Sequence, residues 1–283
     1  MNKCVICKNN KTKVIFVENE IDVLMCKKCG HVFSSYIQKQ NYDGYFGDED
    51  RADIDNFWWK DAHERMYEDF CEKFICRKNG RLLDVGCGLG YFVKKISEFK
   101  SWYVEGCEIS KVAVDYAHNK LGLDNVHLGK AEELDFSPKY FDVITMWDVI
   151  EHIPDPDPIL KYLNKILKDD GYLFIHTPNI NIQLPKARIK KFFQSKRKVG
   201  IHYLEARDHI NIYSSRTIKK VLQNNGFDKI DFVHLYPIQS ASGSKNRAVL
   251  IVKNIWYNLA KIVYKISFKK INVDNLFVTV RKK

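Results

Sequence analysis

Short β-rich runs alternate with helical patterns from residue 81 onward, and this alternation constrains the fold more than any other feature of the chain. The runs RLLDV, WYVEGCEI, VHLG, FDVITMW, YLFIHT, IDFVHLY and NLFVTVRK are typical of strands. Between them lie GYFVKKISEF, SKVAVDYAHNKLG, PILKYLNKILK and SRTIKKVLQNNGF, whose apolar spacing is typical of helices. The alternation predicts an α/β fold with a doubly wound, mostly parallel, seven-stranded Rossmann-like sheet.

Serine and glycine residues mark the predicted ends of the helices. Ser110 and Ser214 stand where an N-cap hydroxyl is expected to accept a hydrogen bond from the first turn. Gly122, Gly171 and Gly226 stand where helices are expected to end. This layout places the carboxyl ends of the parallel strands at one edge of the sheet, where folds of this kind bind ligands.

The first strand leads into a glycine-rich turn, LLDVGCGLGYF. Gly86, Gly88 and Gly90 have no side chain, so a ligand can lie close to the backbone amides. The spacing differs from the dinucleotide pattern G-x-G-x-x-G/A, because Tyr91 occupies its last position. Asp84, at the strand end, would repel a pyrophosphate and attract a cation. The turn therefore predicts a ligand with a positively charged amino acid end.

LLDVGCGLG resembles motif I of the class I S-adenosylmethionine-dependent methyltransferases. The resemblance covers about residues 80–282. It continues with Glu108, at a position where the family has an acid that binds the ribose hydroxyls. KAEEL resembles the segment that flanks the adenine, with Glu132 beside it. FDVITMWDVIEHIPDP and LKDDGYLFIHTPN are similar to the fourth and fifth strand motifs, and HINIYSSRTIKKVLQNNGF to a helix of the small-molecule branch. The resemblance implies S-adenosylmethionine as cofactor, bound by Asp84, Gly86, Cys87, Gly88, Gly90, Glu108, Ile109, Ala131, Glu132 and Trp147.

Candidate catalytic residues follow the fourth strand of the motif order. Asp148, Glu151 and His152 have i, i+3, i+4 spacing and would share one face of a helical turn. They could deprotonate a hydroxyl or hold a divalent cation such as Mg²⁺. WDVIEHIPDP resembles the ubiquinone-pathway O-methyltransferases, whose corresponding residues bind a cation. Alternatively, Glu151 and His152 only shape the pocket wall. His209 is a second candidate base, with a structural role as its alternative.

Four cysteines near the N-terminus have the spacing of a metal site. Two Cys-x-x-Cys pairs, Cys4 with Cys7 and Cys26 with Cys29, flank TKVIFVENEIDVLM, which reads as two short strands. This pattern predicts a zinc ribbon with a closed structural site of four thiolates. Gly30 follows the second pair, where a positive φ is often needed. The alternatives are four unbound thiols or a redox pair. The other four cysteines are expected to be buried thiols.

We divide the chain into a zinc ribbon at residues 1–35, an aromatic helical linker or lid at 36–79, and a methyltransferase domain at 80–283. Basic insertions interrupt the last of these at 179–208 and 240–272. In the linker, NYDGYF carries two tyrosines that either close over the cofactor or pack between the modules.

The positive charge is concentrated in the two insertions. The net charge is +11, yet residues 186–198 and 245–270 each hold seven basic residues and no acid, so the remainder is slightly acidic. Such segments favour an anionic partner, either nucleic acid, anionic lipid or a phosphorylated substrate. Within 245–270, Lys253, Lys261, Lys265 and Lys269 form one stripe of a helix and Ile251, Ile255, Leu259, Ile262 and Ile266 another. That helix either packs its apolar stripe on the domain or lies in a membrane interface.

These features favour an S-adenosylmethionine-dependent methyltransferase that methylates an oxygen of a sugar or another small or lipid-linked acceptor, as in envelope glycan biosynthesis. Oxygen is favoured because the Asn-Pro-Pro-Tyr type of motif of amino-nitrogen methyltransferases is absent from the sequence. The alternative is a ribosomal RNA guanine methyltransferase with a zinc module, and a third interpretation is a non-enzymatic scaffold. Without an apolar signal segment or a run long enough to cross a bilayer, we expect a cytoplasmic protein, with or without peripheral contact at the inner face of the membrane.

Overall fold

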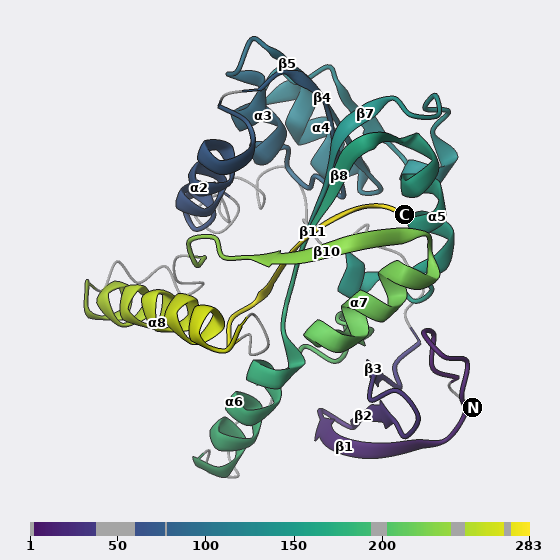
Figure 1. Cartoon of the computed structure of the whole chain (residues 1–283), viewed down its shortest axis with the longest axis vertical. Coiled ribbons are helices and arrows are strands. Elements are labelled where there is room, and N and C mark those ends of the chain that lie inside the picture. The colour runs from purple at the N-terminus through teal and green to yellow at the C-terminus, as the bar shows by residue number, and fades with distance from the viewer. Residues whose placement is uncertain (1–2, 38–59, 77, 194–202, 239–246, 269–272) are drawn as a thin grey trace.

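The computed structural model describes most of the chain (Figure 1), namely residues 3–37, 60–76, 78–193, 203–238, 247–268 and 273–283. Within these residues, seven strands form the larger sheet in the order β10-β11-β8-β7-β4-β5-β6. The strands are β4 (Gly80–Val85), β5 (Trp102–Glu108), β6 (Val126–Leu128), β7 (Phe141–Trp147), β8 (Leu167–Thr177), β10 (Phe227–Val233) and β11 (Leu276–Lys282). Of these, β11 pairs antiparallel with both its neighbours, and the other pairs are parallel. The predicted fold class is confirmed.

Helices cover both faces of this sheet. Their bounds are α2 (Glu64–Phe74), α3 (Tyr91–Ser97), α4 (Lys111–Asn119), α5 (Asp157–Ile166) and α7 (Ser215–Asn224). Apolar residues of α2, α3 and α4 share one buried cluster, whereas those of α5 and α7 share another with the opposite side of the strands. The doubly wound arrangement follows because each amphipathic helix buries its apolar side against the strands before and after it.

The predicted helix ends are correct at four of five positions. Ser110 and Ser214 are N-caps whose hydroxyls accept from the amides of the third helical residue. Gly122 and Gly226 follow α4 and α7 with positive φ. The prediction for Gly171 is wrong, because this residue lies inside β8. A Cβ there would come within 2.8 Å of the Asp142 carbonyl oxygen, so glycine permits close strand packing.

The N-terminal segment forms a second, antiparallel sheet. The predicted hairpin is present as β1 (Thr12–Glu18) and β2 (Ile21–Cys26), followed by β3 (Val32–Ser34). The fourth strand of the described sheet, β9 (Asn211–Ile212), comes from the methyltransferase part of the chain and pairs with β3. The two parts also share a small core of Phe16, Val23, Val32, Ile180, Ala187, Leu204, Ala206 and Ile212. The ribbon is therefore built into the larger domain.

Two helices project from the rest of the molecule (Figure 1). They are α6 (Ile180–Phe193) and α8 (Arg247–Ile266), and they occupy the two basic insertions. Short 3-10 turns, η2 (Ala131–Glu133) and η3 (Ile150–His152), follow β6 and β7. Residues 38–59, which include NYDGYF of the predicted lid, lie outside the described residues, as does Lys269.

Candidate functional site

A cavity of about 810 Å³ opens at the carboxyl ends of β4, β5 and β7, where the topology predicts a ligand site. Most of the predicted cofactor residues line it, namely Asp84, Gly86, Cys87, Gly88, Glu108, Ile109, Ala131, Glu132 and Trp147. Of the predicted catalytic residues, Asp148, His152 and His209 line the same cavity, whereas Gly90 and Glu151 lie outside its lining. One space therefore joins the two predicted halves of the site.

The glycine turn after β4 needs glycine for two reasons. Gly86, Gly88 and Gly90 all have positive φ, between 54° and 86°. A Cβ on Gly86 would lie 2.6 Å from a methyl carbon of Val149, and one on Gly90 would lie 2.9 Å from Leu123. Gly90 is the N-cap of α3 and allows α4 and the loop after it to approach closely. Its contact with the cofactor stays a prediction.

Two buried acids face the turn. Asp84 is 1% exposed, and its Oδ1 accepts a hydrogen bond of 2.6 Å from the Thr145 hydroxyl. Burial raises the pKa of Asp84 to about 8, and nearby Glu108 adds to this effect. The Glu108 carboxylate accepts hydrogen bonds from the amides of Gly88, Ile109 and Ser110 at 2.8 to 3.0 Å. Glu108 thus joins the glycine turn to the end of β5.

Asp148 departs from the predicted helical turn. Its φ is +51°, and η3 begins only at Ile150, so Asp148 does not share a helical face with Glu151 and His152. Its carboxylate lies 3.0 Å from Nδ1 of His176 instead. Burial is the largest single effect and would raise the pKa of Asp148, but the charge and hydrogen bond of His176, together with the charges of His63 and His209, outweigh burial and lower the pKa. Asp148 is therefore a buried anion paired with the end of β8.

His209 takes the place that the sequence suggests for Asp148. Ligand atoms of Glu151, His152 and His209 lie within 4.8 Å of one another, and the two imidazole centroids are 4.9 Å apart. Burial and then the charge of Asp148 raise the pKa of Glu151 well above its usual value. Neither Glu151 carboxylate oxygen has a hydrogen-bond partner in the described part of the chain. Its surroundings therefore favour the protonated form of Glu151, beside two imidazoles.

The two imidazoles are held in a neutral state. Burial, followed by the neighbouring His209, lowers the pKa of His152 to about 4. Burial also lowers the pKa of His209. Nδ1 of His152 lies 3.0 Å from the Asp208 carbonyl oxygen, so Nδ1 carries the proton and Nε2 is the basic nitrogen. Nε2 of His209 lies 3.3 Å from the Glu205 carboxylate.

Several residues of the site are missing from the sequence-based prediction. His63 and Tyr67 reach the cavity from the start of α2, and no motif marks them. His176 ends a parallel strand next to β7, and that position is a usable signal for a polar partner of Asp148. Tyr203 belongs to the loop that closes another wall of the cavity. These contributions depend on how distant segments meet.

The ribbon holds one wall of the cavity in place. The Glu18 carboxylate, 2% exposed, accepts hydrogen bonds from the amides of Tyr203, Leu204 and Glu205 at 2.7, 2.8 and 3.3 Å. Tyr203, Leu204 and Glu205 all line the cavity. Glu18 ends β1, so the hairpin that precedes the second cysteine pair directly supports the site.

A second link runs from the cysteine loop to the turn after η3. Nε2 of His31, two residues after Cys29, lies 2.8 Å from the Asn211 side-chain oxygen. The Asn211 amide nitrogen donates to the carbonyl oxygens of Ile153 at 2.7 Å and Pro154 at 3.4 Å. Ile153 and Pro154 line the cavity, so the cysteine loop and the site are connected through two side chains.

The four N-terminal cysteines lie close enough together to bind one ion. The Sγ atoms of Cys4 and Cys29 are 3.5 Å apart, as are those of Cys7 and Cys26, and all four lie within 4.8 Å of one another. Sulfurs at about 2.3 Å from a tetrahedral zinc are separated by slightly less than 4 Å, so this donor set fits Zn²⁺. Gly30 has the expected positive φ of 78°.

The remaining cysteines are only partly as expected. Cys71 and Cys107 are buried thiols, as predicted, and Cys87 is half-buried in the cavity wall. Cys76 is exposed, so the expectation of a buried thiol is wrong there. It lies just after α2, where the chain turns back to solvent.

Comparison with known proteins places this site in a family. Residues 58–231 match the family model described as a methyltransferase domain. The ubiquinone biosynthesis O-methyltransferase of Neisseria meningitidis is 33% identical over 113 residues, 38% of this chain and 47% of that protein. The probable (S)-tetrahydroprotoberberine N-methyltransferase 2 of Papaver bracteatum is 27% identical over 186 residues, which are 64% of this chain and 46% of that protein. The chain spans about half the length of these curated relatives.

Solved structures show the same fold. Phosphoethanolamine N-methyltransferase 2 of Haemonchus contortus, in complex with S-adenosyl-L-methionine, superposes with a TM-score of 0.55 at 16% identity. The superposition covers 89% of this chain and 62% of that one. At this identity the likeness concerns the architecture of the sheet and its helices.

Proposed function

The chain belongs to the methyltransferase domain family, and from this premise we propose that it transfers the methyl group of S-adenosylmethionine to an oxygen of a small acceptor. The observation that carries the proposal is the single cavity, which joins Asp84, Glu108 and the glycine turn to the imidazoles of His152 and His209. A cofactor site and a pair of bases that open into one space are what transfer to a hydroxyl requires.

The cofactor half of the cavity fits S-adenosylmethionine. Asp84 is a buried acid that accepts a hydrogen bond from the Thr145 hydroxyl, and it would receive the positive ammonium group. Glu108 would accept hydrogen bonds from the ribose hydroxyls, and Ala131 and Glu132 would flank the adenine. When bound, the cofactor supplies an electrophilic methyl group on a sulfonium. The absence of side chains at Gly86 and Gly88 would let the cofactor lie close to the backbone of the turn.

The other half of the cavity would prepare the acceptor. An alcohol or phenol needs a base at neutral pH, because its own pKa is high. We choose His209 as the base, since burial and the neighbouring His209 lower the pKa of His152 to about 4. In this proposal His209 accepts the proton of the acceptor hydroxyl. His152 positions both the His209 ring and the acceptor.

The cluster of Glu151, His152 and His209 also suggests a cation site. Two imidazoles and one carboxylate suit a transition metal better than Mg²⁺, which prefers oxygen ligands. Asp148, the third expected ligand, is paired with His176. We therefore propose the imidazoles as bases and assign no magnesium to the site.

The acceptor class follows from the curated relatives and the size of the cavity. A ubiquinone biosynthesis O-methyltransferase and a plant N-methyltransferase are named for small-molecule chemistry. We propose a sugar, phenol or lipid-linked molecule as acceptor, because a cavity of about 810 Å³ has the size of a small-molecule site.

The test is transfer of labelled methyl from S-adenosylmethionine into separated cell fractions of RNA, free sugar nucleotides, lipid-linked glycans and quinone-like lipids. Label in a sugar, glycan or lipid fraction is the expected result. Label confined to RNA would replace this proposal with the nucleic-acid alternative. Asp84→Asn should abolish label by preventing cofactor binding, whereas His209→Asn should abolish label and leave cofactor binding intact.

A further inference from the structure

Helix α8 contacts the protein through its polar and aromatic side. Tyr257 and Tyr264 are each 8% exposed, and Ala260 between them is fully buried. The Tyr257 ring packs 5.2 Å from Tyr236, and the Tyr264 ring 4.9 Å from His234. These contacts fix which side of α8 faces the larger sheet.

Polar groups on the same side of α8 strengthen the attachment. Nζ of Lys253 donates to the Ile238 carbonyl oxygen at 2.7 Å. The Tyr236 hydroxyl donates to the side-chain oxygen of Asn254 at 2.6 Å. The helix is therefore anchored by hydrogen bonds as well as by aromatic packing, so its orientation is well determined.

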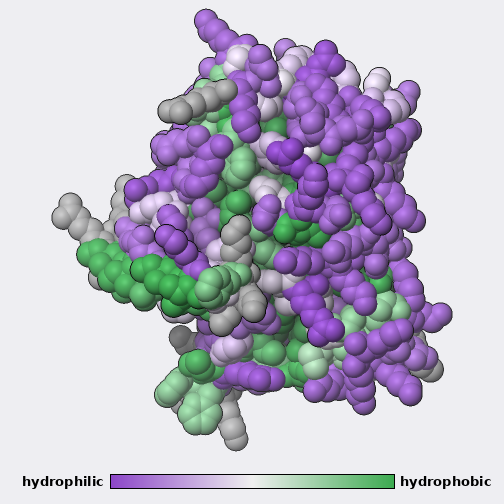
Figure 2. Space-filling model, viewed as in Figure 1, coloured by the Kyte–Doolittle hydropathy of each residue, from purple (hydrophilic) through white to green (hydrophobic). Residues whose placement is uncertain are grey.

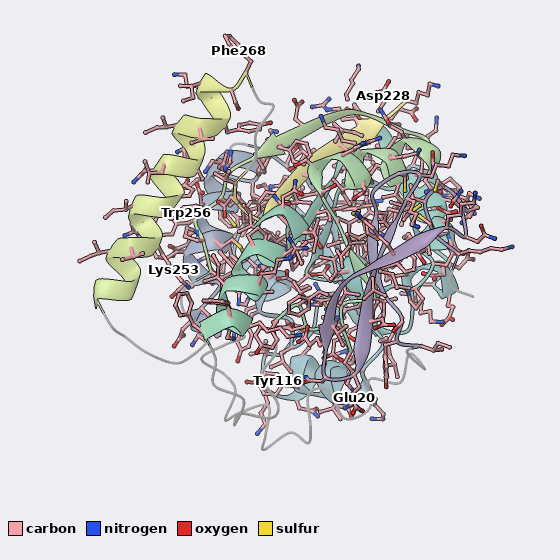
Figure 3. All side chains as sticks on the ribbon, turned by 90° about the horizontal axis from the view of Figure 1, so that it is seen from below. Glu20, Tyr116, Asp228, Lys253, Trp256 and Phe268 are labelled. Carbon is pink, nitrogen blue, oxygen red and sulfur yellow. The ribbon has the colours of Figure 1, made fainter. Side chains whose placement is uncertain are left out.

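The opposite side of α8 is aliphatic and faces solvent. Each of its large apolar residues is at least 45% exposed, namely Ile251, Val252, Ile255, Trp256, Leu259, Ile262 and Ile266. Figure 2 shows this side as a continuous hydrophobic band. Figure 3 shows α8 along the edge of the molecule, with Lys253 and Trp256 on it. The expectation that the apolar stripe packs on the domain is wrong, and a surface of this kind indicates a partner.

Helix α6 adds a second exposed apolar group. Ile189, Phe192 and Phe193 near its end are 59%, 83% and 79% exposed. Like α8, α6 projects from the rest of the molecule (Figure 1). We define the docking surface as the exposed residues of α8 and the end of α6.

The charge of the docking surface selects among partners. Neither helix contains an acid, and Lys261 and Lys265 flank the exposed apolar residues of α8. In α6, Nζ of Lys191 donates to the Val17 carbonyl oxygen at 2.8 Å and Nζ of Lys190 lies over the Tyr203 ring, so the positive charge of the docking surface comes from α8. A second copy of the chain, related by a two-fold axis, would bring these lysines toward one another. Nucleic acid would engage the lysines and leave the aliphatic band in water. An anionic bilayer satisfies both features at once.

We propose that the docking surface binds the anionic face of a lipid bilayer, with α8 lying in the plane of the interface. None of the described helices is long and apolar enough to cross a membrane, which agrees with a helix that lies on the surface. Trp256, with an apolar ring and a polar N–H, suits the boundary between head groups and acyl chains.

The position of the docking surface relative to the cavity suggests how the acceptor arrives. Gln183 of α6 and Ile238, whose carbonyl holds Lys253, both line the cavity. Docking would therefore place the cavity next to the bilayer, where a lipid-borne acceptor could enter it. This last step rests on the proposed methyl transfer, whereas the docking does not.

Cosedimentation of the whole chain with vesicles tests the docking. We expect binding to vesicles that contain phosphatidylglycerol, weak binding to pure phosphatidylcholine, and loss of binding at high salt. Ile255→Ser with Leu259→Ser should weaken binding more than about 100-fold, because two large apolar side chains no longer enter the bilayer. Lys261→Gln with Lys265→Gln should weaken it about 30-fold, because two cations near the anionic surface are lost.

Leu128→Ser is the matched control, because Leu128 is 50% exposed in β6, outside the docking surface. Equal loss in this control, or unchanged binding of the Ile255/Leu259 variant, would overturn the proposal. A dimer by analytical ultracentrifugation that dissociates in that variant, without vesicle binding by the parent, would identify a second copy as the partner. Binding of S-adenosylmethionine without vesicles reports separately on the proposed activity.

Discussion

At the scale of single residues, burial gives the two halves of the cavity their acid–base properties. Asp84 and Glu151 are both buried and both have raised pKa values, while His152 and His209 have lowered ones. In each case the low-dielectric environment disfavours the charged form. The site is therefore less charged before ligands bind than its composition suggests.

Binding of S-adenosylmethionine should release a proton from Asp84. The free carboxyl has a pKa of about 8, and a bound ammonium group favours its ionised form. We expect the affinity to rise as the pH increases from 6 to 8 and then to level off. Calorimetry in buffers of different ionisation enthalpy measures the released proton. Asp84→Asn should lose most of the affinity for S-adenosylmethionine and should release no proton from this position. Undiminished proton release in that variant would contradict the assignment of the proton to Asp84.

His209→Asn should lower kcat by about 100-fold or more, the range of a lost general base. A base must be deprotonated, so parental kcat should fall with decreasing pH only below 6.5, since burial lowers the pKa of His209. His127→Gln is the control, because His127 lies outside the cavity lining, on β6. A fall of kcat that is already present at or above pH 6.5 would argue against His209 as base. So would the same dependence of kcat on pH in the His209 variant.

At the scale of elements, the ribbon hairpin is joined directly to the cavity loop at residues 203–209. Three amides of the loop donate to a single carboxylate, Glu18, and β9 pairs with β3. The same loop also leads to His209 two residues after Arg207. The ribbon therefore supports the acceptor side of the cavity more than the cofactor side.

Glu18→Gln should raise KM for the acceptor and leave cofactor affinity unchanged. The neutral amide is a weaker acceptor than the carboxylate, and we expect a loss of about 1 to 3 kcal/mol in stability. Glu20→Gln is a matched control, because Glu20 is exposed at the tip of the same hairpin (Figure 3). Steady-state kinetics and calorimetry of both variants decide the point. A change in cofactor affinity equal to the change in KM would point to general unfolding.

At the scale of the whole molecule, the two sheets meet at the cavity. The seven-stranded sheet has buried clusters on both faces, and one of them also takes in Cys4, Ile6, Cys26, Cys29 and Phe33 of the ribbon. The ribbon shares a further small core with α6 and the cavity loop. Metal at the four cysteines would stabilise the smaller of these units. The larger sheet should survive without it.

Cys7→Ser should release zinc, loosen the ribbon and lower acceptor turnover, while the larger domain remains folded. Metal content by mass spectrometry, far-ultraviolet circular dichroism and thermal melting measure the three effects. Cys76→Ser, at an exposed cysteine outside the cluster, should change none of them. Full metal retention in Cys7→Ser would count against a four-thiolate site.

The sequence by itself determined the elements and the local geometry. Strand and helix periods, the glycine turn and the paired cysteines are visible because each depends on residues within one or two turns of each other. The seven strands and the N-caps at Ser110 and Ser214 were predictable for this reason.

Only the tertiary structure decided the partners of these elements. The contact of Glu18 with Leu204, the pairing of Asp148 with His176 and the approach of His209 to His152 join residues that are far apart in the chain. Periodicity likewise shows that α8 has an apolar side but not which surface that side meets. That choice depends on the shape and chemistry of the neighbouring domain, where Tyr236, His234 and the Ile238 carbonyl select the polar and aromatic side of the helix.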